Sequence, residues 1–412
     1  MGAPAVDSAR VIADLRELAR RTSDERGAQR LCWGPGWRDA RAFLAELLAE
    51  LGLEPQVDEA GNTWARLEGA TPDEPAVVVG SHLDSVPDGG WLDGALGVIA
   101  GLGVLRSWAA AGEPPPRPLV LVDWADEEGA RFGCSLFGSS AFSGTLDPES
   151  VRDLADAEGR SIVDTLAENG VELARARECA SRRDGLGAYL ELHIEQGPRM
   201  AREGLRAAAV TGCAGIERLR FSFAGQASHA GTTPMEDRRD AALAAAEAAL
   251  ELERIPAAEG GVATTGELRL EPGIPTAVAG SATLSVDLRH PEAEPLARML
   301  DAARIAARSA AERRRCELAE VPLWRIEPIA FDAGLVFAAR RACERVAGEA
   351  ASMASGALHD AAEVARVLPA VMMFAPSKRG ISHAREEDTA EADLAVAIEA
   401  FAALAAQALE RG

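Results

Sequence analysis

The chain has 412 residues, and 48% of them are hydrophobic, so it is long enough to bury more than one core. We therefore expect two structural units. Asp and Glu outnumber Lys and Arg by 65 to 43, which gives a formal net charge of −22. A field of this sign repels nucleic acid and anionic lipid, so we expect neither nucleic acid nor a membrane among the partners.

The N-terminal region and the cysteines indicate a cytoplasmic protein. Asp7 and Arg10 come before any apolar run, which disfavours a secretory signal. No uncharged apolar stretch approaches the roughly 20 residues that a membrane span needs. The six cysteines lie far apart and form no C-x-x-C pair, so the sequence favours neither a zinc ribbon nor a disulfide scaffold. A reducing cytoplasm suits them.

The first half of the chain has the pattern of an α/β domain. Helical periodicity covers residues 10–20 and 39–51. Continuous apolar runs at 76–82 and 119–124 stop at polar residues, as strands buried on both faces do. The glycine-rich stretch 94–111 between these runs is expected to open a packed helix. This order predicts a mostly parallel sheet covered by helices.

From about residue 212 the pattern changes. Residues 219–223 and 282–288 alternate apolar and polar side chains, as strands with one solvated face do. The alanine-rich stretches 239–254 and 295–315 have helical patterns. Together they predict two helices on one face of an antiparallel sheet, which is an α+β arrangement.

The last part of the chain returns to the first pattern. An apolar strand is expected at 371–374, as though completing the first sheet. We therefore expect a catalytic α/β domain formed by residues 1–211 and 326–412. Residues 212–325 are expected to form an inserted α+β domain.

Three of the six histidines stand beside the ends of expected strands: His82, His193 and His383. Ligands in open α/β sheets gather at such ends. Taken singly, a histidine there is more often a structural residue than a metal ligand. Asp84, two residues after His82, is placed to accept the imidazole N–H that a metal would leave unused.

Carboxylates follow two of the expected strands. Asp93, before a glycine, stands where a carboxylate can bridge two cations, although a turn aspartate is an equal alternative. Asp126, Glu127 and Glu128 converge where a buried strand reaches solvent. Like charges this close disfavour one another unless something positive lies among them, and a solvated acidic loop remains an alternative. With two cations present, one glutamate can bind metal while its neighbour accepts a proton from water.

Six motifs follow one another along nearly the whole chain: Gly80-Ser-His-Leu-Asp84, Gly90-Trp-Leu-Asp-Gly94, Asp126-Glu-Glu-Gly-Ala-Arg-Phe132, Leu192-His-Ile-Glu-Gln-Gly-Pro198, His229-Ala-Gly-Thr-Thr-Pro-Met235 and Gly380-Ile-Ser-His-Ala384. Together they resemble the M20-type two-metal amidases. More narrowly they resemble the hydantoinase/carbamoylase family, which includes N-carbamoyl-L-amino acid hydrolases, β-ureidopropionases and allantoate amidohydrolases. The resemblance implies an enzyme that hydrolyses an amide or ureido C–N bond in a small molecule bearing a carboxylate.

The resemblance also implies a set of metal ligands. His82, Asp93 and His193 match metal positions, with Asp93 bridging two divalent ions. Glu128 and His383 match the ligands of the second ion. Zn²⁺, Mn²⁺ and Co²⁺ suit such ligands alike, so the sequence does not choose among them.

Catalytic roles follow from the same resemblance. Glu127 matches the general base. The inserted domain of the family dimerises and closes over the site as a lid, so a homodimer is implied. His229 matches a histidine that is thought to reach the neighbouring subunit's site and stabilise the oxyanion. Arg289 matches the clamp on the substrate carboxylate, a role that suits a bidentate guanidinium, although an exposed strand arginine is an equal alternative from the residues alone.

Further positions match substrate contacts: Gln196, Thr276, Ala357 and His359. Some of these regions depart from the family pattern. Thr276 replaces an asparagine that normally contacts the substrate, and Leu358 adds bulk where close backbone approach is expected. Glu217 stands where allantoate-acting relatives tend to carry arginine, which disfavours so polar a substrate.

The leading interpretation is hydrolysis of N-carbamoyl-L-amino acids to the amino acid, CO₂ and ammonia. β-Ureidopropionate, allantoate, and peptides or acyl-amino acids are the alternatives within the resemblance. A remote alternative is a non-catalytic binding protein on the same fold. All five metal positions and the general base are present, which disfavours that alternative.

Overall fold

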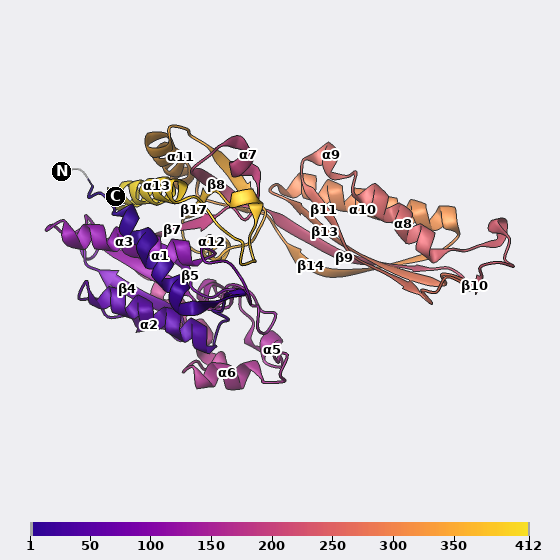
Figure 1. Ribbon diagram of the computed structural model, residues 1–412, viewed down its shortest axis with the longest axis horizontal. Helices are drawn as coiled ribbons and strands as arrows, with labels where there is room; N and C mark the ends of the chain where they lie inside the picture. Colours follow the sequence, from indigo (N-terminus) through magenta and orange to yellow (C-terminus); the bar gives the residue numbers. More distant parts are fainter. Residues whose placement is uncertain (1–2, 411–412) are drawn as a thin grey trace. The chain divides into compact units, whose positions relative to one another are not determined.

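The computed structural model describes residues 3–410. The chain divides into two compact units, which are coloured along the sequence in Figure 1. The first unit consists of Met1–Gly212, Ala330–Met353 and Ala357–Gly412, and the second of Cys213–Ile329 and Ala354–Gly356.

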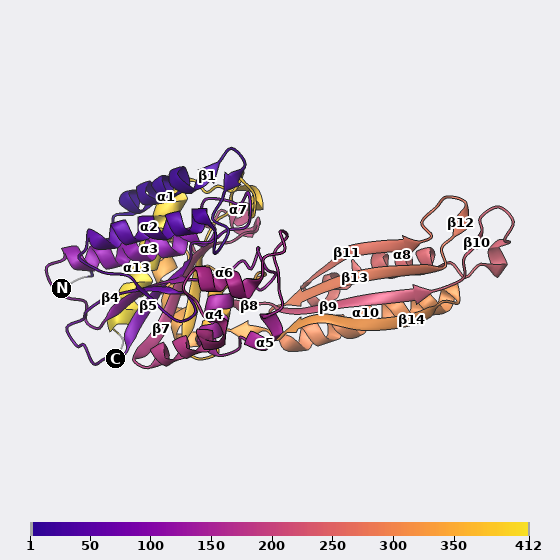
Figure 2. The same ribbon diagram turned by 90° about the horizontal axis from the view of Figure 1, so that it is seen from below.

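A nine-stranded sheet forms the centre of the first unit, and several of its strands are visible in Figure 2. Its strands, in sheet order, are β15 (Ile329–Ala330), β8 (Ala208–Cys213), β17 (Ala370–Ala375), β7 (Leu186–Ile194), β5 (Ala76–His82), β6 (Leu119–Trp124), β4 (Thr63–Leu67) and β3 (Gln56–Val57), with β16 (Ser352–Ser355) pairing β8. The neighbours from β17 to β6 are parallel, whereas β8, β4 and β3 pair antiparallel. The predicted mostly parallel sheet is confirmed.

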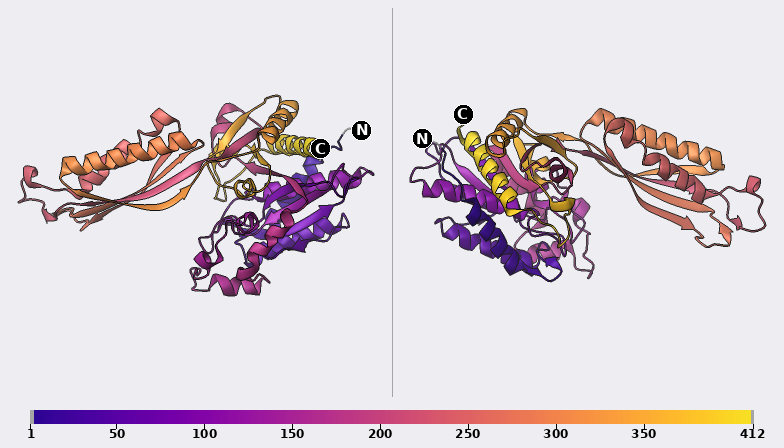
Figure 3. Two further views of the ribbon diagram at one scale, coloured as in Figure 1. Left: turned by 180° about the vertical axis from the view of Figure 1, so that it is seen from behind. Right: turned by 45° about the horizontal axis from the view of Figure 1, so that its top comes forward.

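Helices cover this sheet, and α11 and α13 lie side by side in Figure 3. The longer helices are α1 (Ser8–Thr22), α2 (Pro35–Ala49), α3 (Ala95–Ala110), α11 (Ala333–Ala347) and α13 (Glu391–Glu410). The shorter elements are α4 (Phe137–Ser143), α5 (Pro148–Val151), α6 (Ile162–Glu168), η1 (Leu173–Arg183), α7 (Arg199–Glu203), α12 (Asp360–Val364) and η3 (Lys378–Gly380), with a hairpin of β1 (Ser23–Asp24) and β2 (Gly27–Ala28). Every residue of β5, β6 and β17 is buried, which explains their continuous apolar runs.

One helix of the described residues, α13, is long and apolar enough to cross a membrane by length and composition, with a mean hydropathy of 1.6. In the structure 61% of its most apolar stretch is buried, and it packs against α1, α3 and α11. Burial of this kind is typical of a core helix.

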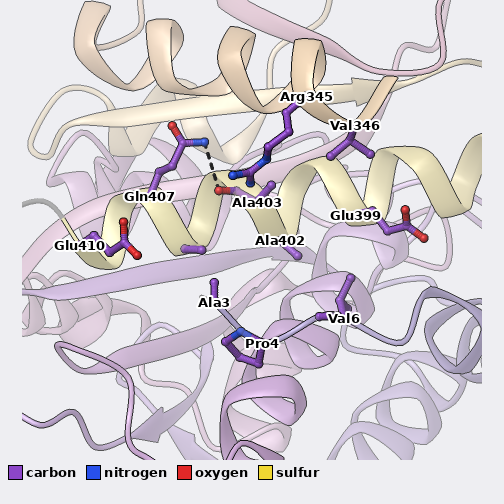
Figure 4. Close-up of a pocket in the computed structure, with 12 residues that line it drawn as sticks. Ala3, Pro4, Val6, Arg345, Val346, Glu399, Ala402, Ala403, Gln407 and Glu410 are labelled. Atoms are coloured by element: carbon purple, nitrogen blue, oxygen red, sulfur yellow. Dashed lines mark hydrogen bonds between the residues drawn. The ribbon is translucent and has the colours of Figure 1, made fainter. Parts of the chain in front are cut away.

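A cavity of about 630 Å³ lies along this helix, between Ala403, Gln407 and the N-terminal segment that carries Pro4 (Figure 4). None of the predicted site residues lines this cavity. The candidate site therefore lies elsewhere in the first unit.

The second unit is an antiparallel sheet covered on one face. Its strand order is β11 (Val262–Glu271), β13 (Ser281–His290), β9 (Gly215–Ala224) and β14 (Glu317–Ile326), and Figure 2 shows the four strands. The helices are α8 (Ala241–Leu252), α9 (Pro256–Glu259) and α10 (Ala293–Arg314), with a short η2 (Met235–Asp237) and a two-stranded ribbon of β10 (Ser228–His229) and β12 (Ala277–Val278).

The alternation of apolar and polar residues sets this arrangement. Along β13 every second residue is buried, and Leu284 packs with Phe221 of β9 in the core beneath the two long helices. Alanines such as Ala245 on α8 and Ala307 on α10 let the helices approach the sheet closely. The predicted pair of helices on one face of an antiparallel sheet is confirmed.

Candidate metal centre

The register of two neighbouring strands brings His82 and His193 together. Gly80 of β5 pairs with Glu191 of β7, so the histidine two residues further along each strand lies at the same end of the sheet. The two imidazole rings are 5.9 Å apart between centroids, and both are buried. Parallel pairing thus turns two distant sequence motifs into one pair of nitrogen donors.

Asp93 lies in the loop between β5 and α3 and faces both histidines. Its Oδ1 is 3.1 Å from His193 Nε2 and 4.0 Å from His82 Nε2. Gly94, which follows it with a φ of 64°, is the N-cap of α3. A Cβ on Gly94 would lie 2.3 Å from the His82 ring, so only glycine lets the loop pass this close. His82, Asp93 and His193 form a group with the spacing of metal ligands.

A second group shares the same aspartate. Asp93 Oδ2 lies 3.2 Å from His383 Nε2, and that nitrogen lies 3.5 Å from Glu128 Oε2. His383 has a left-handed φ of 55°, and its side chain is half exposed. The two oxygens of Asp93 therefore face two different groups of possible ligands, as the role of a bridging carboxylate requires.

Two buried polar atoms in these groups fit a cation. Within residues 3–410, Glu128 Oε1 is buried without a hydrogen-bond partner, and His193 Nε2 is buried with Asp93 Oδ1 at 3.1 Å but without a hydrogen bond of acceptable geometry. Buried polar groups are normally paired, so atoms left in this state indicate a ligand that satisfies them. Imidazole nitrogens and carboxylate oxygens are the donors that Zn²⁺, Mn²⁺ and Co²⁺ accept. The residues present fit a divalent metal.

The electrostatics of the site point the same way. Burial, together with the nearby charge of Asp93, raises the pKa of Glu128 to about 7. The hydrogen bond to Asp93 raises the pKa of His383 to about 9. Without a cation, the protein environment thus disfavours ionisation of Glu128 and favours the protonated form of His383. A cation among them would favour the ionised carboxylates.

Glu127 is placed beside the first group. Its Oε2 lies 3.7 Å from His82 Nε2, and its side chain is largely buried. Burial, with the charge of Glu128, raises the pKa of Glu127 well above its ordinary value. A raised carboxyl pKa suits a group that must take up and return a proton near neutral pH.

Asp84 holds the acidic turn in place. Its two carboxylate oxygens accept the backbone N–H groups of Glu127 and Glu128, each at 3.2 Å. The His82 Nδ1 lies 3.1 Å from the Asp84 carbonyl oxygen and 3.5 Å from Oδ1. The expected carboxylate contact is thus longer than the contact to the backbone of the same residue. Asp84 fixes both His82 and the paired glutamates.

Three of the predicted substrate contacts lie in the first unit. The Gln196 amide donates to Asp93 Oδ2 at 2.9 Å, and its backbone is left-handed with a φ of 57°. The His359 ring lies 4.4 Å from that of His193, and burial, followed by the effect of His193, lowers the pKa of His359 well below its ordinary value. Ala357 is half-buried two residues before it. His359 also forms a possible ligand group with Glu191 and His193.

His229 and Thr276 come together in the second unit. His229 pairs with Ala277 across the β10–β12 ribbon, and the N–H of Ala230 donates to the Thr276 carbonyl at 2.9 Å. The His229 side chain is exposed, and its Nδ1 accepts the N–H of Gly231 at 3.0 Å. The ribbon therefore brings both predicted residues, which belong to two separate segments, close together in this unit.

Arg289 is fixed at the end of β13. Its Nε donates to Asp287 Oδ1 at 2.8 Å, and its Nη1 donates to the Gly356 carbonyl at 2.8 Å. Arg218 also donates to Asp287, at 2.6 Å. The contacts with Asp287 and Gly356 thus fix the orientation of the Arg289 guanidinium on the polar face of the strand.

Sequence reasoning missed several polar residues around the centre. Glu387 accepts the N–H groups of Leu92 and Asp93, each at 3.0 Å. Glu191 accepts hydrogen bonds from Ser81 Oγ at 2.7 Å and from the Tyr189 hydroxyl at 3.1 Å. A signal for Glu191 was present, because an acidic residue inside an otherwise apolar buried strand needs partners. Glu387 stands in an acidic run that resembles a solvated turn, so its burial is not visible from the sequence.

The chain resembles known proteins over nearly its whole length. A model of peptidase family M20/M25/M40 matches residues 78–407. The chain is 36% identical over 389 residues to an N-carbamoyl-L-amino acid amidohydrolase of Geobacillus stearothermophilus, with 94% of each chain covered. It is 33% identical over 379 residues to an allantoate amidohydrolase of Escherichia coli (strain K12), with 91% of this chain and 92% of that one covered.

The fold is similar to that of solved relatives as well. An amidase of the hydantoinase/carbamoylase family from Burkholderia multivorans superposes with a TM-score of 0.91 at 33% identity, with 100% of each chain covered. The predicted resemblance is thereby confirmed. The chain belongs to peptidase family M20/M25/M40 and, within it, to the hydantoinase/carbamoylase-type amidohydrolases, enzymes that hydrolyse amide or ureido C–N bonds.

Proposed function

We propose that the protein hydrolyses N-carbamoyl-L-amino acids with two divalent metal ions. His82, Asp93 and His193 would hold one ion, and Asp93, Glu128 and His383 the other. The observation that carries this proposal is the position of Asp93, whose two oxygens face two separate ligand groups. The 36% identity to an N-carbamoyl-L-amino acid amidohydrolase supports the choice of substrate.

When bound, the ions would lower the pKa of a water molecule and polarise the carbamoyl oxygen. Glu127 takes a proton from the water as its oxygen attacks the carbamoyl carbon. Glu127 then returns that proton to the leaving nitrogen as the C–N bond breaks. The amino acid departs, and the carbamic acid that remains breaks down to CO₂ and ammonia. Burial favours this role, because it keeps the proton affinity of Glu127 high enough to accept and return a proton.

Residues of the second unit would complete the site. Arg289 would bind the α-carboxylate of the substrate. One hydrogen on each of its Nη atoms has no partner among residues 3–410, which leaves a pair of donors for a carboxylate. His229 would stabilise the developing oxyanion in the site of a partner subunit, so the active form would be a homodimer. Gln196, Thr276, Ala357 and His359 would contact the substrate.

Allantoate is the second candidate substrate, because the chain is 33% identical to an allantoate amidohydrolase. Glu217 disfavours it. Its largely buried carboxylate pairs with Arg325 at 3.0 Å on the sheet that also carries Arg289. The change from arginine to glutamate removes a donor for a polar substrate. β-Ureidopropionate and simple peptides or acyl-amino acids remain within the same reaction class.

The compartment is also part of the proposal. The buried thiols of Cys32, Cys179 and Cys343 form no disulfide, which suits a reducing cytoplasm.

A substrate panel tests the proposal. The metal-free protein would be reconstituted with Mn²⁺, Zn²⁺ or Co²⁺ and given N-carbamoyl-L-amino acids, their D-enantiomers, β-ureidopropionate, allantoate and N-acetyl-L-amino acids. Ammonia release reports ureido hydrolysis, and amine detection reports acyl hydrolysis. The proposal expects the highest kcat/KM on an N-carbamoyl-L-amino acid. A higher kcat/KM on allantoate or on an acyl-amino acid would contradict it, and no turnover of any substrate with any metal would favour a binding protein.

A further inference from the structure

Glu387 makes an unusual set of contacts for an acidic side chain. It is 2% exposed and follows His383 by four residues, in the loop before α13. One carboxylate oxygen, Oε1, accepts both backbone N–H groups of Leu92 and Asp93 at 3.0 Å. The other oxygen, Oε2, accepts the Ser382 hydroxyl at 2.8 Å. A single carboxylate thus joins two loops that are almost 300 residues apart in sequence.

The loop that carries Asp93 is shaped to fit this carboxylate. A Cβ on Gly90 would lie 2.0 Å from Glu387 Cδ, so the backbone approaches the carboxylate only because this residue is glycine. The buried Arg30 donates to the Gly90 carbonyl at 3.4 Å and to the Leu83 carbonyl at 2.7 Å. The loop is therefore held by two side chains, the guanidinium of Arg30 and the carboxylate of Glu387.

The two ligand groups differ in what supports them. His82 and His193 are the ends of paired strands in the central sheet, and both are buried. His383 stands in a loop with a left-handed φ of 55°, and 49% of its side chain is exposed. The hydroxyl of Ser382, the residue directly before it, lies 3.2 Å from Asp93 Oδ2 and also contacts Glu387 Oε2. The group that contains His383 thus depends on the contacts between these two loops.

We propose that Glu387 is a positioning residue that holds the Asp93 loop and the His383 loop at the separation that the second metal ion requires. This inference rests on the two-metal centre proposed above. Glu387 contacts the backbone of one ligand and the neighbour of another, so it acts through them. Loss of Glu387 would loosen the Asp93, Glu128 and His383 group, whereas the sheet would keep His82 and His193 in place.

Four variants test the role of Glu387. Glu387→Ala removes both acceptors. Glu387→Gln keeps an amide oxygen that can accept the two backbone N–H groups. Ser382→Ala removes the link between Glu387 and the His383 loop, together with the contact of the same hydroxyl with Asp93 Oδ2, and leaves the two backbone hydrogen bonds of Glu387 in place. Glu386→Ala is the matched control, because Glu386 is the adjacent acidic residue and its side chain is 48% exposed.

The measurement is the number and affinity of bound Zn²⁺ and Co²⁺ ions, by equilibrium dialysis with elemental analysis and by the absorption spectrum of the Co²⁺ protein. Replacing groups that orient metal ligands commonly weakens binding by about 10- to 100-fold. We expect a loss of that size for the second ion alone in Glu387→Ala, and a smaller loss for that ion in Ser382→Ala. Glu387→Gln should stay within about threefold of the wild type, and Glu386→Ala should match it.

Several results would overturn the inference. Two ions bound with wild-type affinities in Glu387→Ala, or an equal loss at both sites with a lowered melting temperature, would show that Glu387 does not position the second group. A loss in Glu387→Gln as large as in Glu387→Ala would contradict the hydrogen-bonding role. If Glu387→Ala fails to fold, unchanged metal binding in Ser382→Ala overturns the inference. A wild-type protein that binds fewer than two ions would instead contradict the proposed function itself.

Discussion

The two sheets of this protein accommodate charge in opposite ways. In the first unit, β5, β6 and β17 are buried along their whole length, and a polar side chain there needs a partner. In the second unit, β13 buries every second residue and leaves the others at least partly open to solvent. A histidine or carboxylate at the end of a buried strand is therefore informative, whereas an arginine on a half-solvated strand costs little and carries less information.

This difference explains which candidate residues are more readily recognised. His82 and His193 end strands that admit few polar residues, so their chemistry stands out. Arg289 lies among other charged residues on the open face of its strand, and only its contacts with Asp287 and Gly356 distinguish it.

The largest effect is expected at the buried end of the first sheet. Glu127→Gln keeps the size of the side chain and removes the proton acceptor. We expect it to retain two ions and bind substrate while kcat falls by roughly 10²- to 10⁴-fold, the range for general acid–base catalysis. Steady-state kinetics and metal analysis measure both quantities.

The adjacent Glu128 is the matched comparison. Glu128→Gln replaces a charged ligand with a weak neutral one, so it should lose one ion and regain part of its activity in excess Mn²⁺ or Zn²⁺ by mass action. Loss of metal in Glu127→Gln with full metal in Glu128→Gln would mean that the two roles are exchanged. Unchanged rates in both variants would contradict the two-metal mechanism.

Core substitutions test the burial contrast directly. Met372 and Met373 are adjacent in β17 and both fully buried, so each change to alanine should lower the free energy of unfolding by about 2–5 kcal/mol. In β9, Phe221→Ala should cost about 3–5 kcal/mol, whereas Arg220→Ala should stay within about 0.5 kcal/mol. Denaturant unfolding measures these changes. Equal losses at Phe221 and Arg220 would mean that β9 is not half-solvated.

The sequence predicts a large part of this architecture, for physical reasons. The continuous apolar run in β5 reflects burial on both faces of the sheet, and the alternation in β13 reflects burial on one face. Both patterns can be recognised from the residue types alone. Contacts made by loops are different. Glu387 lies in an acidic run, and its burial depends on Gly90 and the Asp93 loop packing against it. Such a contact depends on the tertiary fold and not on local pattern.

A smaller effect is expected on the open strand of the second unit. Arg289→Ala should lower kcat/KM for a carboxylate-bearing substrate. The loss should correspond to about 1.5–3 kcal/mol of transition-state stabilisation, the usual contribution of hydrogen bonds to charged groups. Metal content should not change. Arg218→Ala is the control, because Arg218 contacts the same Asp287 and has no predicted role in binding. An equal loss on substrates whose carboxylate is amidated would mean that Arg289 is structural.

The smallest effect is expected from a change of one pH unit. The pKa of His383 in the metal-free protein is raised to about 9, so a proton occupies the imidazole below that pH. Metal binding needs the neutral ring and the ionised Glu128, whose pKa is raised to about 7. The affinity of the second ion should therefore rise with pH, by up to about tenfold for each unit between pH 7 and 9 and more steeply below pH 7. Chelator competition between pH 6 and 9 measures this dependence. If the affinity of the second ion does not vary over this range, the ion does not displace a proton from His383.

Anomalous diffraction from crystals reconstituted with Zn²⁺ or Mn²⁺ would show whether Asp93 is shared between two ions. Two peaks are expected in each subunit, one bound by His82, Asp93 and His193 and the other by Asp93, Glu128 and His383. A single peak, or a peak held by Glu191, His193 and His359 with none at Asp93, would contradict this sharing.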